Sequence, residues 1–324
     1  MNLKRRALLV AATIAVSLPG VALAQPAERA YGVGFLTIGS KSRAQRGIER
    51  VRRALERSGA IAGRGLRFEV RAAAENLANV KKFAGELGAA RLDALLADGV
   101  DAAAALREAT ASTPIVAVVG LNPQHEDAAV RIIRGGGNVT GVTFSNIELA
   151  ARRLELLRQV FPESRRIRFL TQKDAERWVE IETRDAAKLG FRIEPHMVED
   201  LGEMERFFAR RLRRDEAIYV ATTARNALRL NSIVTLANQA RARIVYPATE
   251  YAEAGGLMSC AADQGAALER AAGLLLRVLQ GAKPAEIPVE RSTEVFITVN
   301  RGAAKELGVT IPPEVLARAD RVID

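Results

Sequence analysis

The segment RGGGNVTGVTF, residues Arg134–Phe144, decides how the chain is organised. Clustered glycines followed by a β-branched run are typical either of a phosphate-binding loop or of a turn that feeds a strand. A phosphate-binding loop follows a strand and opens a helix, whereas these glycines precede a strand. Gly32 and Gly34 also lie inside an expected strand, the wrong place for a dinucleotide-binding loop. The segment is therefore predicted to be a tight turn feeding a strand that crosses between two structural units.

Strands and helices alternate on both sides of this turn. Helical spacing of apolar residues recurs, as in Ile48, Val51 and Leu55. This alternation predicts an α/β fold of two doubly wound, parallel-sheet lobes. The expected strands are 31–37, 66–70, 93–97 and 114–119 before the turn, and 166–170, 191–198, 217–221 and 244–247 after it.

The C-terminal part adds elements that return to both lobes. A strand is expected near 255–259, then a helix over 264–279 capped by Asp263. A further strand over 295–299 leads to a short helix capped by Asn300. The chain is therefore expected to cross between the lobes more than once.

The N-terminus predicts an exported protein. Lys4, Arg5 and Arg6 precede an apolar run that ends at Pro19, and Ala22-Leu23-Ala24 has the small-x-small pattern of a cleavage site. The run is too short to span a bilayer. Residues 1–24 are therefore expected to be a signal peptide cleaved after Ala24, which gives a periplasmic protein without direct membrane insertion. The twin-arginine and general export routes both remain open.

Charge and cysteine content exclude several classes of protein. The net charge is +10, and arginines recur along the helices expected near 41–57 and 204–213. Neither run has the pattern of interleaved aromatic residues of a nucleic-acid surface, so no nucleic-acid partner is expected. Both runs are interpreted as solvated helix faces, with an electrostatic surface for an anionic ligand or lipid headgroups as the alternative. The single cysteine, Cys260, is expected to be buried, because it has no partner for an internal disulfide.

Motifs that would indicate catalysis are missing. His125 and His196 are the only histidines, and neither lies at metal-ligand spacing. The sequence has no G-x-S-x-G segment for a hydrolase nucleophile. The chain is therefore predicted to be a binding protein and not an enzyme, with no catalytic residues, no metal site and no cofactor.

The best candidates for ligand contacts follow the expected strands. In open α/β sheets, ligands bind beyond the carboxyl ends of the strands, where helix N-termini and hydroxyl side chains suit anionic groups. Arg225 is interpreted either as a contact to an acidic ligand group or as a solvent-facing side chain. Trp178 is expected to pack within its lobe. The predicted ligand-binding residues are Thr37, Gly39, Ser40, Gly99, Asn122, Thr143, Ser145, Thr171, Thr222, Thr249 and Glu250.

Six stretches resemble one family. They are VGFLTIGS, STPIVAVVG, GGNVTGVTFSNIELAARRLELL, EAGGLMSCAAD, GAKPAEIPVE and VNRGAAKELGVTIPPEVLARADRVI. From Val33 onward, the chain resembles the ABC transporter substrate-binding proteins of the periplasmic-binding-protein-like type I fold, in the group related to tryptophan- and phenylalanine-binding members. It departs from them in the cleft loops 121–123, 171–173 and 222–225. An aromatic amino acid ligand is therefore not inferred for this chain from the resemblance.

This resemblance implies two lobes that close on a solute about a three-crossover hinge. The implied N-terminal lobe is 30–143 plus 254–282 and the C-terminal lobe is 144–253 plus 283–324, with crossings near 143–146, 249–254 and 281–291. The implied function is the periplasmic solute-binding subunit of an ABC importer, which captures a small polar organic solute, with amino-acid-like solutes as one candidate class, and delivers it to an inner-membrane ABC permease. A monomer is expected because it suits hinge closure. Two alternatives stay open: a sensory module for a membrane receptor kinase, and an exported enzyme that uses the same cleft.

Overall fold

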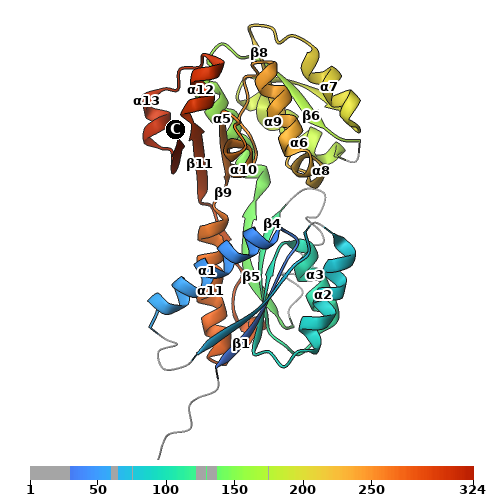
Figure 1. The fold of residues 1–324 in the computed structure, drawn as a ribbon, viewed down its shortest axis with the longest axis vertical. Coiled ribbons are helices and arrows are strands. Elements are labelled where there is room, and N and C mark those ends of the chain that lie inside the picture. The colour runs from blue at the N-terminus through green and yellow to red at the C-terminus, as the bar shows by residue number, and fades with distance from the viewer. Residues whose placement is uncertain (1–29, 60–64, 75, 122–128, 130–136, 174) are drawn as a thin grey trace, which may run out of the picture.

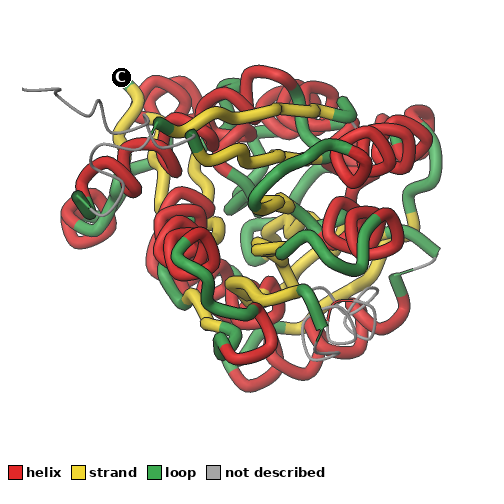
Figure 2. The backbone as a smooth tube through the Cα atoms, turned by 90° about the horizontal axis from the view of Figure 1, so that it is seen from below, coloured by secondary structure: helices red, strands yellow, loops and turns green. Residues whose placement is uncertain are grey.

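The computed structural model describes residues 30–59, 65–74, 76–121, 129, 137–173 and 175–324. These residues form two α/β lobes, one above the other along the long axis of the molecule (Figure 1). Seen along that axis, helices lie around a central set of strands (Figure 2). The expected α/β class with two lobes is confirmed.

The N-terminal lobe contains a six-stranded, fully parallel sheet in the order β10-β5-β4-β3-β1-β2. Helices α1 and α11 cover one face, and α2 and α3 cover the other. Both faces are therefore apolar: Leu96 belongs to the first core and its neighbour Leu95 to the second. The elements are β1 (Tyr31–Thr37), α1 (Lys41–Arg57), β2 (Leu66–Ala72), α2 (Leu77–Ala89), β3 (Ala94–Asp98), α3 (Val100–Ala109), β4 (Ile115–Leu121), β5 (Val139–Ser145), α11 (Gln264–Leu279), the 3₁₀ turn η1 (Pro284–Glu286) and β10 (Glu290–Ser292).

The C-terminal lobe contains two three-stranded sheets, in the orders β7-β6-β8 and β12-β11-β9. Single bridges, Ile218 with Ile244 and Tyr246 with Ser259, connect them, so the strand expected over 244–247 forms only bridges. The elements are α5 (Asn146–Val160), β6 (Arg166–Thr171), α6 (Glu176–Lys188), β7 (Arg192–Met197), α7 (Leu201–Ala209), β8 (Glu216–Val220), α8 (Ala224–Leu228), α9 (Leu230–Gln239), α10 (Thr249–Glu253), β9 (Met258–Ala262), β11 (Val295–Asn300), α12 (Arg301–Leu307), α13 (Pro313–Ala317) and β12 (Arg321–Ile323).

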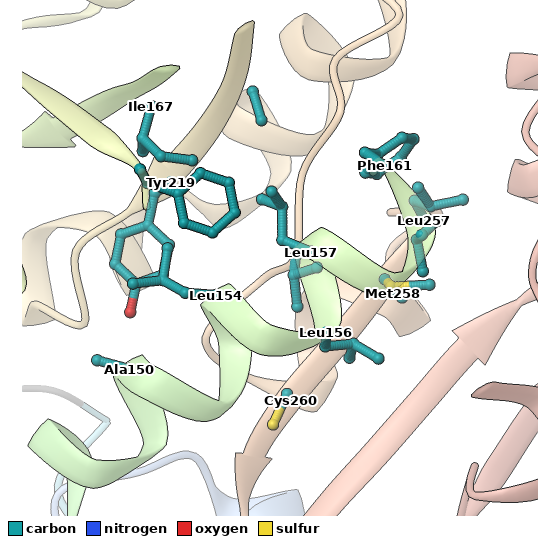
Figure 3. Close-up of a cluster of buried hydrophobic side chains, with 14 of the residues drawn as sticks. Ala150, Leu154, Leu156, Leu157, Phe161, Ile167, Tyr219, Leu257, Met258 and Cys260 are labelled. Carbon is teal, nitrogen blue, oxygen red and sulfur yellow. The ribbon is translucent and has the colours of Figure 1, made fainter. Parts of the chain in front are cut away.

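Helix α5 anchors the core of this second lobe. Its residues Leu154 and Leu157 lie beside Tyr219 of β8 and Ile167 of β6, and Cys260 of β9 lies on its other side (Figure 3). Cys260 is buried, as the sequence predicted. The apolar face of α5 thus joins the two small sheets into one core.

The described end of the glycine-rich segment, Gly137 and Asn138, is a turn that feeds β5, as predicted. Gly137 has a φ of +79°, a conformation that side chains rarely adopt, and β5 begins two residues later. The Asn138 side-chain amide donates to the carbonyl oxygens of Thr110 (2.9 Å) and Thr113 (2.8 Å). These bonds tie the turn to the loop before β4. Residues 134–136 lie outside the described residues.

Within the described residues, the chain passes between the lobes at three places. The first lies at the junction of β5 and α5, inside the expected range 143–146. The second lies between β9 and α11 and the third between β10 and β11, so the expected ranges 249–254 and 281–291 are wrong. The family resemblance implied those ranges, whereas strand pairing places the two crossings next to the ends of β9 and β10.

The same pairings correct two expected lobe boundaries. Strand β9, expected in the N-terminal lobe, pairs with β11 in the C-terminal lobe. Strand β10, expected in the C-terminal lobe, pairs with β5 in the N-terminal lobe. Both are short strands whose partners lie far away in the sequence, so local pattern carries no signal for them.

The expected helix caps are present. The Asp263 carboxylate accepts from the Ala266 N–H at 2.9 Å, and the Asn300 side chain accepts from the Ala303 N–H at 2.8 Å. Helices α8 and α9 are separated by the single residue Arg229. In the described part of the chain, no helix has both the length and the apolar composition needed to cross a membrane.

Candidate functional site

A cleft of about 570 Å³ lies between the two lobes. From the N-terminal lobe it is lined by one face of α1, the start of α3 and the end of β5. From the C-terminal lobe it is lined by α10, the loop after β8 and part of β11. These are mostly carboxyl ends of strands and the helix starts that follow them, the usual position of a ligand in an α/β sheet.

Four of the predicted site residues line this cleft: Gly99, Thr222, Thr249 and Glu250. Gly99 has a φ of +110° and is the N-cap of α3, so its backbone conformation favours glycine. Thr249 and Glu250 begin α10. The two lobes therefore place strand-end residues from distant parts of the chain in one cavity.

Three other predicted residues organise the turn behind the cleft wall. Thr37 is fully buried, and its hydroxyl donates to Asp98 Oδ2 at 2.9 Å. The Gly39 N–H donates to the Thr37 hydroxyl at 3.1 Å, and Ser40 is the N-cap of α1. Asp98 itself lines the cleft. In the structure, Thr37 and Gly39 thus orient a cleft residue.

Of the remaining predicted residues, Thr143, Ser145 and Thr171 lie outside the cleft lining. The Thr143 hydroxyl donates to the Glu290 carbonyl at 3.3 Å, and Ser145 is the N-cap of α5. Thr171 is fully buried at the end of β6. Asn122 lies outside the described residues. Thr143 and Ser145 nevertheless lie at the first crossing between the lobes.

The arginines of α1 were not among the predicted ligand-binding residues, because the solvated-face interpretation was preferred. Arg43, Arg46 and Arg50 line the cleft, so the interpretation of the whole run as a solvated helix face is wrong for these three. Spacings of three and four residues put them on one helix face. Their position just after a strand end is the signal that identifies them.

Arg43 contacts groups from both lobes. Its Nη2 donates to the side-chain oxygen of Gln264, which starts α11. Its Nε lies 3.9 Å from Asp98 Oδ2, and its Nη1 lies 3.6 Å from Oε1 of Glu250 across the cleft. The last contact is an ion pair between the two lobes.

Behind the cleft wall, the C-terminal lobe contains a buried polar network centred on Arg153 of α5. Its Nη1 donates to the hydroxyls of Tyr219 (2.7 Å) and Thr222 (3.1 Å), and its Nε donates to the Cys260 carbonyl (3.1 Å). The Tyr219 hydroxyl in turn donates to Glu182 at 3.1 Å. Since Thr222 lines the cleft, this network supports part of the cleft wall.

Burial raises the pKa of Glu182 to about 7, although the Arg153 charge and the Tyr219 hydrogen bond act to lower it. A carboxyl whose pKa is higher in the folded protein than in the unfolded chain binds protons preferentially in the folded state. Its contribution to stability is therefore complete below the unfolded pKa of 4.5 and is lost as the pH rises to about 7.

Glu182→Gln is accordingly expected to remove a pH-dependent term of at most about 3 kcal/mol from the free energy of unfolding. Glutamine keeps an acceptor for the Tyr219 hydroxyl without the charge. Urea unfolding of the wild type and the variant at pH 5 and pH 8 measures the effect. Relative to the wild type, the variant should have a higher free energy of unfolding at pH 8 than at pH 5. An equal difference at both pH values would show that Glu182 titrates normally.

Two further sequence interpretations are resolved by the structure. Trp178 is fully buried in α6, within its own lobe as predicted. Arg225 forms an ion pair with Glu199 and lies outside the cleft lining, so it is engaged within the C-terminal lobe. Among the described residues, no group of three or more His, Cys, Asp or Glu side chains is arranged to hold a metal ion.

Comparison with known proteins identifies relatives that bind small molecules, in agreement with a cleft between two lobes. Residues 36–323 match the family model of the ABC transporter substrate binding protein. A tyrosine-binding protein of Clostridioides difficile (strain R20291) is 21% identical over 259 residues, which cover 79% of this chain and 74% of that protein.

Two solved structures share the fold. The ABC domain in complex with L-Trp from Streptococcus pneumonia superposes with a TM-score of 0.72 at 25% identity, over 90% of this chain and 100% of that one. The ligand-free, open structure of a substrate binding protein with adhesive properties from Clostridium difficile gives 0.74 at 19% identity, over 90% and 99%. With the family model matching most of its length, the chain belongs to the ABC transporter substrate binding protein family.

Proposed function

We propose that this chain is the solute-binding subunit of an ABC importer and that it captures its solute between the two lobes. The observation that carries the proposal is the cleft, because residues of both lobes line it and three crossings connect them. A solute that touches both walls stabilises the closed arrangement by its differential affinity for that arrangement. An inner-membrane ABC permease then receives the solute from the closed form.

The proposed solute is an amino acid. A relative is named for tyrosine binding and a structural neighbour contains L-Trp, which supports this class. The cleft of this chain offers matching chemistry: Phe144 and Phe296 supply apolar surface from opposite lobes, while Arg43 and Glu250 supply both signs of charge. A zwitterion with an apolar side chain suits such a lining.

The proposal includes export and a monomeric state. Residues 1–24 are proposed to be removed after Ala24, which places the mature chain in the periplasm. The lobes are proposed to move as two bodies about the three crossings. A monomer suits this motion, since each lobe must be free to rotate relative to the other.

A thermal-shift screen of the mature chain from Gln25 tests the function. The probes are the twenty amino acids, with sugars, nucleosides and amino-free carboxylates for comparison. A solute that binds only the folded protein, at a hundred times its Kd, stabilises it by about 2.7 kcal/mol. An amino acid should raise the unfolding midpoint, and calorimetry should give one site per chain. If no solute shifts the midpoint, the solute-binding function is wrong.

A further inference from the structure

Two helix faces of opposite charge line the cleft, one from each lobe, beside Asp98 and Asp101 on the N-terminal wall and Arg321 on the C-terminal wall. On the N-terminal wall, Arg43, Arg46 and Arg50 lie along one face of α1. On the C-terminal wall, Glu250 and Glu253 lie along α10, one helical turn apart. Basic and acidic helix faces therefore oppose each other across the space where a solute would sit.

These charged groups differ in how fully they are paired. Glu253 forms an ion pair with Arg321 of its own lobe, and Arg50 lies 3.6 Å from Glu269 of α11. Arg43 is held by the hydrogen bond to Gln264, but its nitrogens lie 3.6 Å and 3.9 Å from the two carboxylates, outside hydrogen-bond distance for the charge-assisted pairs of a guanidinium. Arg43 is thus held in one orientation, and much of its hydrogen-bond donor capacity remains available to a group in the cleft.

We propose that Arg43 is the residue by which the cleft recognises a carboxylate of its solute, and that this carboxylate takes the place of Glu250. The proposal rests on the proposed function, since it names the group on the solute that the cleft selects. A guanidinium has five donors in a planar fork and accepts a carboxylate in bidentate geometry.

The exchange keeps the charges balanced. Without a solute, Arg43 and Glu250 partly neutralise each other across the lobes. When a solute carboxylate binds Arg43, the released Glu250 becomes available to a cationic group of the same solute. A zwitterion therefore satisfies both residues, whereas an acid without an amino group leaves Glu250 unpaired.

Arg43 is favoured over Arg50 by its partners, because it lies near carboxylates of both lobes whereas Arg50 pairs with Glu269 of its own lobe. The Arg43 side chain retains 35% of its exposure, so a solute can reach it. Asp98 beside it is 14% exposed and is fixed by the Thr37 hydroxyl at 2.9 Å. Asp98 and Gln264 together hold the guanidinium in one orientation, and this reduces the entropy lost when a solute binds.

The test compares Arg43→Gln with Arg53→Gln, which makes the same change on the same helix. The Arg53 guanidinium donates to the Glu49 carbonyl and lies outside the cleft lining. Calorimetric titrations use L-tyrosine, L-tryptophan and any other amino acid that the wild type binds, together with the matching amines and amino-free acids. Thermal unfolding of the free proteins checks that each variant is folded.

Arg43→Gln is expected to weaken binding of the amino acid by roughly 10- to 100-fold, the effect of losing a charged hydrogen bond. Binding of the amine, which has no carboxylate, should be no weaker in Arg43→Gln than in the wild type, and should be strengthened where its ammonium group pairs with Glu250, because the change removes the cation that competes for Glu250. Arg53→Gln should bind all probes as the wild type does. Glu250→Gln should strengthen binding of the amino-free acid, because it removes the group that competes for Arg43.

The possible failures are distinct. If the wild type binds only solutes without a carboxylate, or if Arg43→Gln binds the amino acid as tightly as Arg53→Gln, the role of Arg43 is refuted while solute binding stands. If the wild type binds no solute, both the role of Arg43 and the proposed function are refuted. A fall in amino acid binding in Arg43→Gln alone, with no loss of amine binding, supports the proposal.

Discussion

Replacing Gly141 with alanine is expected to abolish stable folding of the N-terminal lobe, with a loss of about 3 kcal/mol or more in the free energy of unfolding. Gly141 lies in β5 and pairs with Ala117 of β4. A Cβ at this position would lie 2.0 Å from the Ala117 carbonyl oxygen and 2.8 Å from its carbonyl carbon. Because both atoms are backbone atoms, no change of rotamer relieves the overlap, and β4 and β5 would have to separate.

Gly85→Ala is the matched control in the same lobe. Gly85 lies on the exposed side of α2, and an added Cβ there meets nothing within 4 Å. Alanine has a higher helix propensity than glycine. The free energy of unfolding of this variant should therefore rise by about 0.5–1 kcal/mol. Urea unfolding and soluble yield report both changes. A Gly141→Ala protein as stable as the wild type would mean that β4 and β5 are not as close as described.

Arg153→Met is expected to lower the free energy of unfolding by about 3–5 kcal/mol, the usual loss when one member of a buried polar network is removed. Arg153 is fully buried, and its guanidinium donates to Cys260, Tyr219 and Thr222. Methionine fills part of the volume but leaves these acceptors without a donor. Glu182 also loses its nearby positive charge, so its pKa should rise further and the loss should be greater at pH 8 than at pH 5.

Arg152→Met provides the control at the adjacent position of α5. Arg152 is exposed and lies 3.4 Å from Glu155, a surface pair that contributes less than about 1 kcal/mol. Urea unfolding at both pH values compares the variants. The double variant Arg153→Met with Glu182→Gln should be less destabilised than the sum of the single changes, since the two residues belong to one network. Strict additivity would argue against a coupled network.

Much of the fold follows from local signals in the sequence. The predicted cap Asp263 begins α11, and the predicted cap Asn300 begins α12. The turn before β5 follows from glycine and asparagine at positions that need them. Each of these features depends on residues close together in the chain, so periodicity and capping chemistry are sufficient to predict them.

The site was only partly predictable for the same reason. Strand ends indicated Thr222, Thr249 and Glu250, because a parallel sheet collects its carboxyl ends at one edge. Thr37 has the same sequence signal yet is buried behind the wall, since its hydroxyl holds Asp98. Whether a strand-end side chain faces the cavity or the turn depends on its neighbours in space.

By itself, the sequence determined the α/β class, the order of most helices and strands, the turn at Gly137 and the family resemblance. Only the tertiary structure decided which lobe β9 and β10 join, where the second and third crossings lie, and that Arg43 faces Glu250 across the cleft. The physical reason is the separation in sequence over which each kind of interaction acts. Helix caps and apolar periodicity act over a few residues, whereas strand pairing and charge pairing between lobes join residues far apart in the chain.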